Sequence, residues 1–234
     1  MGRSDPARRS PCGVGRRERL VSIVDNGRLQ ERLGESRLIA ILRGSDVDAT
    51  VAAARTLLDA GVLTLEIALT LEGAEEAIAQ VVQDAPADAM IGAGTALTPA
   101  DVDRAVSAGA QFMVTPTLSA SVEYAIREGV GVLPGVYSPT EIQRGLDLGA
   151  AAVKLFPASG LGPGFLRAVR EPLPHARIIP VGGVSVGTVG EYLEAGAFAI
   201  GVGGPLLGDA ATPSGDLGAL AARAAAFRHA VSRP

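Results

Sequence analysis

The stretch DLGAAAVKLFP (residues 147–157) contains the repeating unit that decides the fold. It runs from the end of a helix-like segment through Gly149 into an apolar segment that predicts a β-strand. Gly149 stands where helices commonly end on a residue with left-handed backbone, which glycine adopts most easily. The predicted strand holds a single charged residue, Lys154.

The same helix–glycine–strand pattern recurs along the chain. The other phrases are AGV (60–62), AGA (108–110), EGV (128–130) and AGA (195–197). The steps between successive glycines, from Gly61 onward, are 48, 20, 20 and 47 residues. Because the long steps are twice a unit of about 23 residues, each unit is interpreted as one strand followed by one helix.

Filling in the missing units predicts eight strands. They are expected near residues 38–43, 62–69, 89–95, 111–116, 131–136, 151–156, 177–182 and 197–203. Their nearly continuous apolar character is typical of parallel strands covered by helices. Proline after Thr98, Ser138 and Gly162 indicates helix starts.

Eight such units predict a (β/α)₈ TIM barrel in a single domain, residues 26–234. Residues 26–34 predict a short N-terminal helix that closes the bottom of the barrel, and residues 1–25 are expected to form a disordered extension. A doubly wound open sheet is the alternative, although it usually has fewer units and a nucleotide-binding fingerprint near its start.

Composition excludes several classes of function. The 234 residues carry 21 Lys+Arg against 25 Asp+Glu, a net charge of −4, with two histidines and one cysteine. These numbers are too small for a structural zinc site or a disulfide framework, and the acidity disfavours nucleic acid as a partner. With no apolar run of about 18 residues and no signal-peptide pattern, we expect no membrane partner and a cytoplasmic location.

Lysine is almost absent, since 20 of the 21 basic residues are arginine. Lys154 is the exception, and on a strand it shares one face with Phe156 while Val153 and Leu155 share the other. If the latter two meet the helices, Lys154 points into the barrel. Burial favours its free amine, the form that attacks carbonyl carbons and that arginine cannot supply. The alternative is an edge lysine that reaches solvent.

Other polar residues fall at strand ends, where barrels of this kind place their active sites. Glu66 lies within the apolar run LTLEIAL (63–69) and is a candidate proton shuttle or a structural ion-pair partner. Arg43 ends the first strand and is a candidate clamp for a carboxylate or phosphate, or an exposed loop residue. Gly182, Gly183, Gly203 and Gly204 follow the last two strands, the usual phosphate site.

These motifs together resemble the 2-keto-3-deoxy-6-phosphogluconate (KDPG) aldolase family. The resemblance includes its 6-phosphogalactonate branch and its 4-hydroxy-2-oxoglutarate (KHG) activity, and it covers roughly residues 30–230. The matching phrases are LIAILRG (38–44), LEIAL (65–69), IGAGT (91–95), VTP (114–116), LPG (133–135), VKLFP (153–157) and VGG (181–183).

The resemblance implies a lyase that cleaves a 2-keto-3-deoxy-6-phospho-sugar acid reversibly to pyruvate and glyceraldehyde 3-phosphate. A KHG cleavage to pyruvate and glyoxylate is also implied. Lys154 would form a covalent Schiff base without any cofactor or metal, and Glu66 would move protons. The substrate-binding residues it implies are Arg43 and Thr95 for the carboxylate, Pro116 and Phe156 around the imine, and Gly182, Gly183, Gly203 and Gly204 for the phosphate. The partners implied are a small keto acid and two further copies of the chain, in a homotrimer.

Three positions depart from the family pattern: Thr70 where some members have arginine, Val181 where gluconate-type members have threonine, and Gly204 where others have serine. Both gluconate and galactonate stereochemistry therefore stay open, as does an unphosphorylated substrate. The alternatives are a phosphosugar epimerase or a synthase on the same barrel, and a catalytically silent binding protein.

Overall fold

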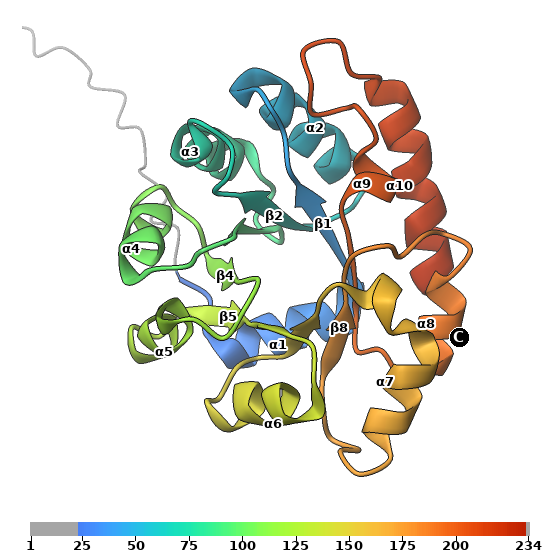
Figure 1. The fold of residues 1–234 in the computed structure, drawn as a ribbon. Helices are drawn as coiled ribbons and strands as arrows, with labels where there is room; N and C mark the ends of the chain where they lie inside the picture. Colours follow the sequence, from blue (N-terminus) through green and yellow to red (C-terminus); the bar gives the residue numbers. More distant parts are fainter. Residues whose placement is uncertain (1–22, 233–234) are drawn as a thin grey trace, which may run out of the picture.

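The strands form a closed parallel barrel surrounded by helices (Figure 1). The computed structural model describes residues 23–232. The strands are β1 (Leu38–Leu42), β2 (Thr64–Ala68), β3 (Met90–Gly94), β4 (Phe112–Val114), β5 (Gly131–Leu133), β6 (Gly135–Val136), β7 (Val153–Leu155), β8 (Ile178–Pro180) and β9 (Ile200–Val202). All ladders are parallel, and the two sheets run in the orders β5-β4-β3-β2-β1-β9 and β6-β7-β8.

The two sheets belong to one barrel. β5 and β6 flank Pro134, which lacks the N–H needed for a continuous ladder, so the strand predicted at 131–136 is divided there. On the other side, a parallel bridge between Val181 and Gly201 connects the end of β8 to β9. Counting β5 and β6 as one strand, the predicted eight-stranded barrel is confirmed.

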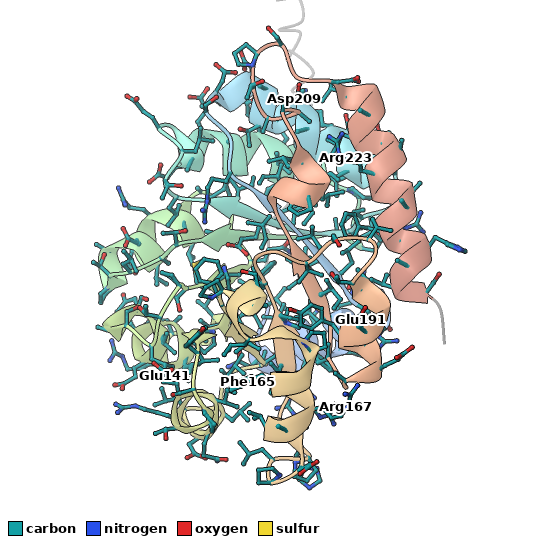
Figure 2. All side chains as sticks on the ribbon, turned by 45° about the vertical axis from the view of Figure 1, so that its right-hand side comes forward. Glu141, Phe165, Arg167, Glu191, Asp209 and Arg223 are labelled. Atoms are coloured by element: carbon teal, nitrogen blue, oxygen red, sulfur yellow. The ribbon has the colours of Figure 1, made fainter. Side chains whose placement is uncertain are left out.

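One helix precedes the first strand, and the others follow the strands and surround the barrel (Figure 1). They are α1 (Asn26–Ser36), α2 (Val47–Asp59), α3 (Ala74–Asp84), α4 (Pro99–Ser107), α5 (Ala120–Arg127), α6 (Pro139–Asp147), α7 (Gly162–Arg170), α8 (Val189–Glu194), α9 (Gly204–Leu207) and α10 (Leu217–Ser232), with a 3₁₀ turn at Ala158–Gly160. Arg223 attaches α10 to the barrel by donating hydrogen bonds to the carbonyls of Leu206 and Leu207, 2.6 and 2.8 Å away (Figure 2).

Local signals in the sequence set the helix ends. Thr98 and Asp101 form a capping box at the start of α4, and Ser138 and Glu141 form one at α6, where Figure 2 labels Glu141. The five repeat glycines all have positive φ, between 73° and 98°. Both the predicted helix starts and the predicted glycine turns are confirmed.

Side chains alternate between two apolar layers. Leu65, Ile67, Val153 and Leu155 belong to the layer between strands and helices, whereas the inner layer fills the barrel. Leu29 and Leu33 of α1 join that inner layer, which includes Phe112 and Ile179. The prediction that a short N-terminal helix closes the barrel is therefore confirmed.

The expected N-terminal extension lies outside the described residues up to position 22. Its last three residues are described, and two of them belong to the domain. Val24 is 1% exposed in the inner layer and exchanges backbone hydrogen bonds with Gln111 and Gly131, while Asp25 caps α1. Within residues 23–232, no helix is both long and apolar enough to cross a membrane.

Candidate active site

Lys154 is buried inside the barrel, on the middle residue of β7. Its neighbours along the strand point toward the helices, and its side chain is 8% exposed. Register places it beside Gly135 of β6 on one side and Ile179 of β8 on the other. The side-chain nitrogen Nζ lies 5.5 Å from the ring centre of Phe156, which shares its face. The predicted orientation of this lysine is confirmed.

Glu66 meets Lys154 inside the barrel. Its carboxylate oxygen Oε1 lies 3.5 Å from Nζ, and its side chain is only 2% exposed. Oε1 is one of two buried side-chain polar atoms that have no hydrogen-bond partner within residues 23–232. Because a buried and unpaired carboxylate oxygen is costly, the lysine beside it is its main compensation. The arrangement allows a proton to pass between this oxygen and Nζ or a ligand bound to Nζ.

Gly94 provides the space that Glu66 occupies. A Cβ atom on Gly94 would lie 2.0 Å from Oε1 and 2.7 Å from both Cγ and Cδ of Glu66. A residue with any side chain at this position would therefore displace the carboxylate. The glycine-rich end of β3 thus has a packing role in the site, in addition to the turn that glycines commonly form.

A cavity of about 160 Å³ opens beside the lysine. Its charged lining residues are Lys154 and Arg43, without any acidic residue, so the cavity favours an anion. Arg43 is exposed, and its guanidinium makes no ion pair or hydrogen bond with residues 23–232. The remaining lining residues are Ile41, Phe156, Val181, Gly182, Gly183, Val184, Gly201, Val202, Gly203, Gly204 and Pro205.

The predicted glycines lie together at one wall of this cavity. Gly182 and Gly183 have φ of 90° and 81°, and a Cβ on Gly182 would lie 3.2 Å from the Phe156 ring. With Gly203 and Gly204 of the neighbouring strand end, they leave backbone surface uncovered. Backbone N–H groups at the ends of the last two barrel strands are suited to hold a phosphate.

Thr95 and Pro116 lie near the Lys154–Glu66 pair but not among the residues that line the cavity. Thr95 follows Gly94 directly and has a φ of 65°, a left-handed conformation that threonine rarely adopts. The Pro116 carbonyl oxygen lies where a Cβ of Gly135 would be, 2.1 Å from that position, and Gly135 pairs with Lys154. Thr95 thus follows the glycine that packs against Glu66, and Pro116 contacts the glycine that pairs with Lys154.

Sequence reasoning missed Thr115, which fixes the loop that carries Pro116. Thr115 is fully buried, and its hydroxyl donates to the Thr117 carbonyl at 2.5 Å while accepting the Gly135 N–H at 3.4 Å. A hydroxyl residue directly before proline at a strand end was the available signal. Ile41 and Val184, two apolar walls of the cavity, have no such signal in the sequence.

The described residues contain no group of three or more His, Cys, Asp or Glu side chains that could hold a metal ion. The site itself brings together a buried amine, a carboxylate and a wall of backbone that favours an anion. A buried amine with a carboxylate beside it can form a covalent adduct with a carbonyl compound.

Comparison with known proteins identifies the family. Residues 29–222 match the profile of the KDPG and KHG aldolases. A probable 2-dehydro-3-deoxy-6-phosphogalactonate aldolase of Rhizobium meliloti (strain 1021) is 38% identical over 174 residues, which is 74% of this chain and 82% of the relative. The 2-dehydro-3-deoxy-phosphogluconate aldolase of Treponema pallidum (strain Nichols) is 36% identical, over 70% of this chain and 78% of the relative.

Comparison with solved structures points to the same family. A native KDPGal structure superposes with a TM-score of 0.77 at 34% identity, covering 83% of this chain and 93% of the other. A 4-hydroxy-2-oxoglutarate/2-dehydro-3-deoxyphosphogluconate aldolase from TTHB1 gives 0.75 at 36% identity, covering 89% and 100%. The chain belongs to the KDPG and KHG aldolase family, and it is an aldolase, a carbon–carbon lyase.

Proposed function

We propose that this aldolase works through a Schiff base on Lys154, with Glu66 as the proton shuttle and no cofactor. The observation that carries the proposal is the buried pair itself: an amine and an unpaired carboxylate oxygen 3.5 Å apart, beside an anion-favouring cavity. A salt bridge with only a structural role would not need the adjoining cavity or the free Arg43 at its mouth.

The reaction follows from this geometry. Nζ of Lys154 attacks the C2 keto carbon, and loss of water from the carbinolamine gives a protonated imine. Glu66 takes the proton of the C4 hydroxyl while the C3–C4 bond breaks, and the electron pair of that bond moves to the imine nitrogen. This step releases the aldehyde and leaves an enamine. Protonation of the enamine at C3 and addition of water then release pyruvate and restore the amine.

The cavity supports an anionic substrate with two charged ends. Arg43 and Thr95 would hold the carboxylate next to the imine, and Pro116 and Phe156 would pack around the reacting carbons. At the other wall, Gly182, Gly183, Gly203 and Gly204 would donate backbone N–H groups to a phosphate. We therefore propose 2-keto-3-deoxy-6-phospho-sugar acids as substrates, cleaved to pyruvate and glyceraldehyde 3-phosphate.

Relatives with both sugar configurations in their names match this chain, two of the galactonate type and one of the gluconate type at 36–38% identity. Val181 lines the cavity. It stands where gluconate-type members have threonine, and valine there favours the galactonate configuration. Cleavage of 4-hydroxy-2-oxoglutarate is proposed as a second activity, since a solved relative at 36% identity bears that name. The homotrimer and the cytoplasmic location stay predictions.

A four-substrate assay tests the proposal. Purified protein is given 2-keto-3-deoxygluconate and the galactonate epimer, each with and without the 6-phosphate, and pyruvate release is followed with lactate dehydrogenase. We expect the highest kcat/KM with a phosphorylated acid and no release by Lys154→Arg. Faster cleavage of the unphosphorylated acids would contradict the phosphate assignment, and an active Lys154→Arg would contradict the Schiff base. An epimerase or synthase would release no pyruvate.

A further inference from the structure

A second cavity lies at the opposite end of the barrel from Lys154. It has a volume of about 520 Å³ and is bordered by the first residues of β1 and β2 and by the C-terminal ends of α1 and α10. The lining residues that matter here are Arg32, Glu35, Ser36, Arg37, Thr64 and Arg228. The mechanism proposed above uses none of them.

Two features mark functional sites in proteins: left-handed backbone at a residue with a side chain, and a buried polar atom without a hydrogen-bond partner. Each of them occurs at two of the described residues. Within residues 23–232, only Thr95 and Arg37 combine a side chain with left-handed backbone. In the same part of the chain, only Glu66 and Ser36 carry a buried side-chain polar atom without a hydrogen-bond partner. One residue of each pair belongs to the active site, while the other two, Ser36 and Arg37, are adjacent and line the second cavity. Strained backbone and orphaned polar atoms persist where function requires them.

Arg37 is unusual in its place. It follows the last residue of α1 and has a φ of 52°. This is the left-handed conformation that glycine adopts at the five repeat turns of the chain. Arginine has a Cβ and is less stable than glycine in this conformation. Its guanidinium makes no ion pair or hydrogen bond with residues 23–232, so helix capping by the side chain does not explain it.

The other charges leave the cavity positive. Arg32 pairs with Glu35 at 3.0 Å and also donates to the Asp88 carbonyl, so its charge is balanced. Arg228 donates one N–H to the Ala60 carbonyl at 2.8 Å and has further donors on its guanidinium. The C-terminal ends of α1 and α10 carry the negative ends of the helix dipoles, which favours arginine side chains here. Arg37 and Arg228 nevertheless add two positive charges, and the lining contains no acidic residue that lacks an ion-pair partner.

Hydroxyl donors complete this wall. Ser36 carries the unpaired hydroxyl, and Thr64 of β2 also lines the cavity. Two guanidinium groups and two hydroxyls offer more donors than the two oxygens of a carboxylate can use. A phosphate group, with three terminal oxygens and a charge near −2, matches this donor set better.

We propose that this second cavity binds a phosphate-bearing metabolite, held by Arg37 and Arg228 with Ser36 as an additional donor. Its volume accommodates a molecule larger than a single phosphate ion. The site is separate from the catalytic cavity, and the inference does not depend on the proposed function. A ligand here would bind to the folded state alone and would raise its stability.

The test must first prevent anion binding in the catalytic cavity, because that cavity also favours anions. Gly204→Asp does this, since a Cβ at Gly204 meets nothing within 4 Å and the new carboxylate repels anions. In this background, Tm is measured with millimolar inorganic pyrophosphate against chloride of equal ionic strength. We expect pyrophosphate to raise Tm by several degrees, and both Arg37→Gly and Arg37→Gln to abolish the rise.

Comparing the two variants separates the effect of the backbone from the effect of the anion. Without anion, Arg37→Gly should raise Tm by about 2–4 °C by relieving the left-handed backbone, whereas Arg37→Gln should not. Arg167→Gln, which removes an exposed arginine of α7 that lines neither of the two cavities (labelled in Figure 2), is the charge-matched control and should keep the pyrophosphate effect. An undiminished pyrophosphate effect in both Arg37 variants would overturn the proposal. A change in the mass of the assembly on Arg37→Gln would also overturn it, by assigning the cavity to a contact between copies.

Discussion

Gly94→Ala is the substitution that best isolates the position of Glu66. The new methyl group would lie 2.0 Å from Oε1 and 2.7 Å from Cγ and Cδ. An ordinary contact needs at least 3.4 Å, so the carboxylate must move by more than 1 Å. The backbone of Gly94 is not left-handed, so alanine can adopt its backbone conformation and only the new methyl group is in conflict.

A displacement of this size has a predictable effect on the chemistry. Moving a reacting group by about 1 Å commonly lowers the rate on the order of 100-fold. Because Lys154 keeps its place on β7, Schiff-base formation should persist while the steps that need Glu66 become slow. We therefore expect kcat to fall roughly 100-fold with a smaller change in KM.

The assay is pyruvate release at 25 °C, together with exchange of the pyruvate methyl protons in deuterium oxide, which reports enamine formation. Gly92→Ala is the matched control on the same face of β3, because the atoms nearest to its methyl group would be those of the Phe112 ring, 2.5 Å away. That control should lose about 1–3 kcal/mol of stability but keep its kcat. Equal kcat values for Gly94→Ala and wild type would refute the reasoning about Glu66.

Three further predictions concern other parts of the site and fold. Arg43→Ala should raise KM for phosphorylated keto acids roughly 10- to 100-fold, since charged hydrogen bonds contribute about 1.5–3 kcal/mol; a KM unchanged in steady-state assays would exclude a role in binding. Thr115→Val should cost about 1–3 kcal/mol in urea unfolding, because it leaves the Gly135 N–H buried without its partner. Finally, the N–H of Tyr137 and the hydroxyl of Ser138 lower the pKa of Glu141. A lowered pKa means that the carboxylate stabilises the fold above its ordinary titration range and loses this effect as the pH falls. The advantage of wild type over Glu141→Gln in unfolding at pH 7 should therefore shrink and then vanish as the pH is lowered through the titration of this carboxyl group.

The fold was predictable because its signals are local. A glycine that ends a helix and an apolar run that follows it are both properties of about ten neighbouring residues, and eight repetitions leave few topologies. Strand alternation then indicated that Lys154 faces inward. The break at Pro134 was not predicted, although the missing N–H of proline is a local signal for it. The inclusion of Val24 in the core was not predicted because it depends on hydrogen bonds to distant residues.

The site was only partly predictable for the same reason. Residue type and position singled out Lys154, Glu66 and Arg43, but the 3.5 Å approach of the first two depends on the closure of the barrel. The space that Gly94 leaves for Glu66 likewise exists only in three dimensions. Arg37 carries no sequence signal at all, because its strained backbone becomes visible only when the end of α1 is placed against β1.

The central claim is that Lys154 is the covalent nucleophile, and reductive trapping tests it most directly. Protein is incubated with pyruvate and sodium borohydride, and the intact mass and the peptide map are measured by mass spectrometry. The account predicts one reduced pyruvate adduct per chain, located on the peptide that contains Lys154 and absent from Lys154→Arg. An unlabelled wild-type protein, or an adduct at any other position, would contradict it.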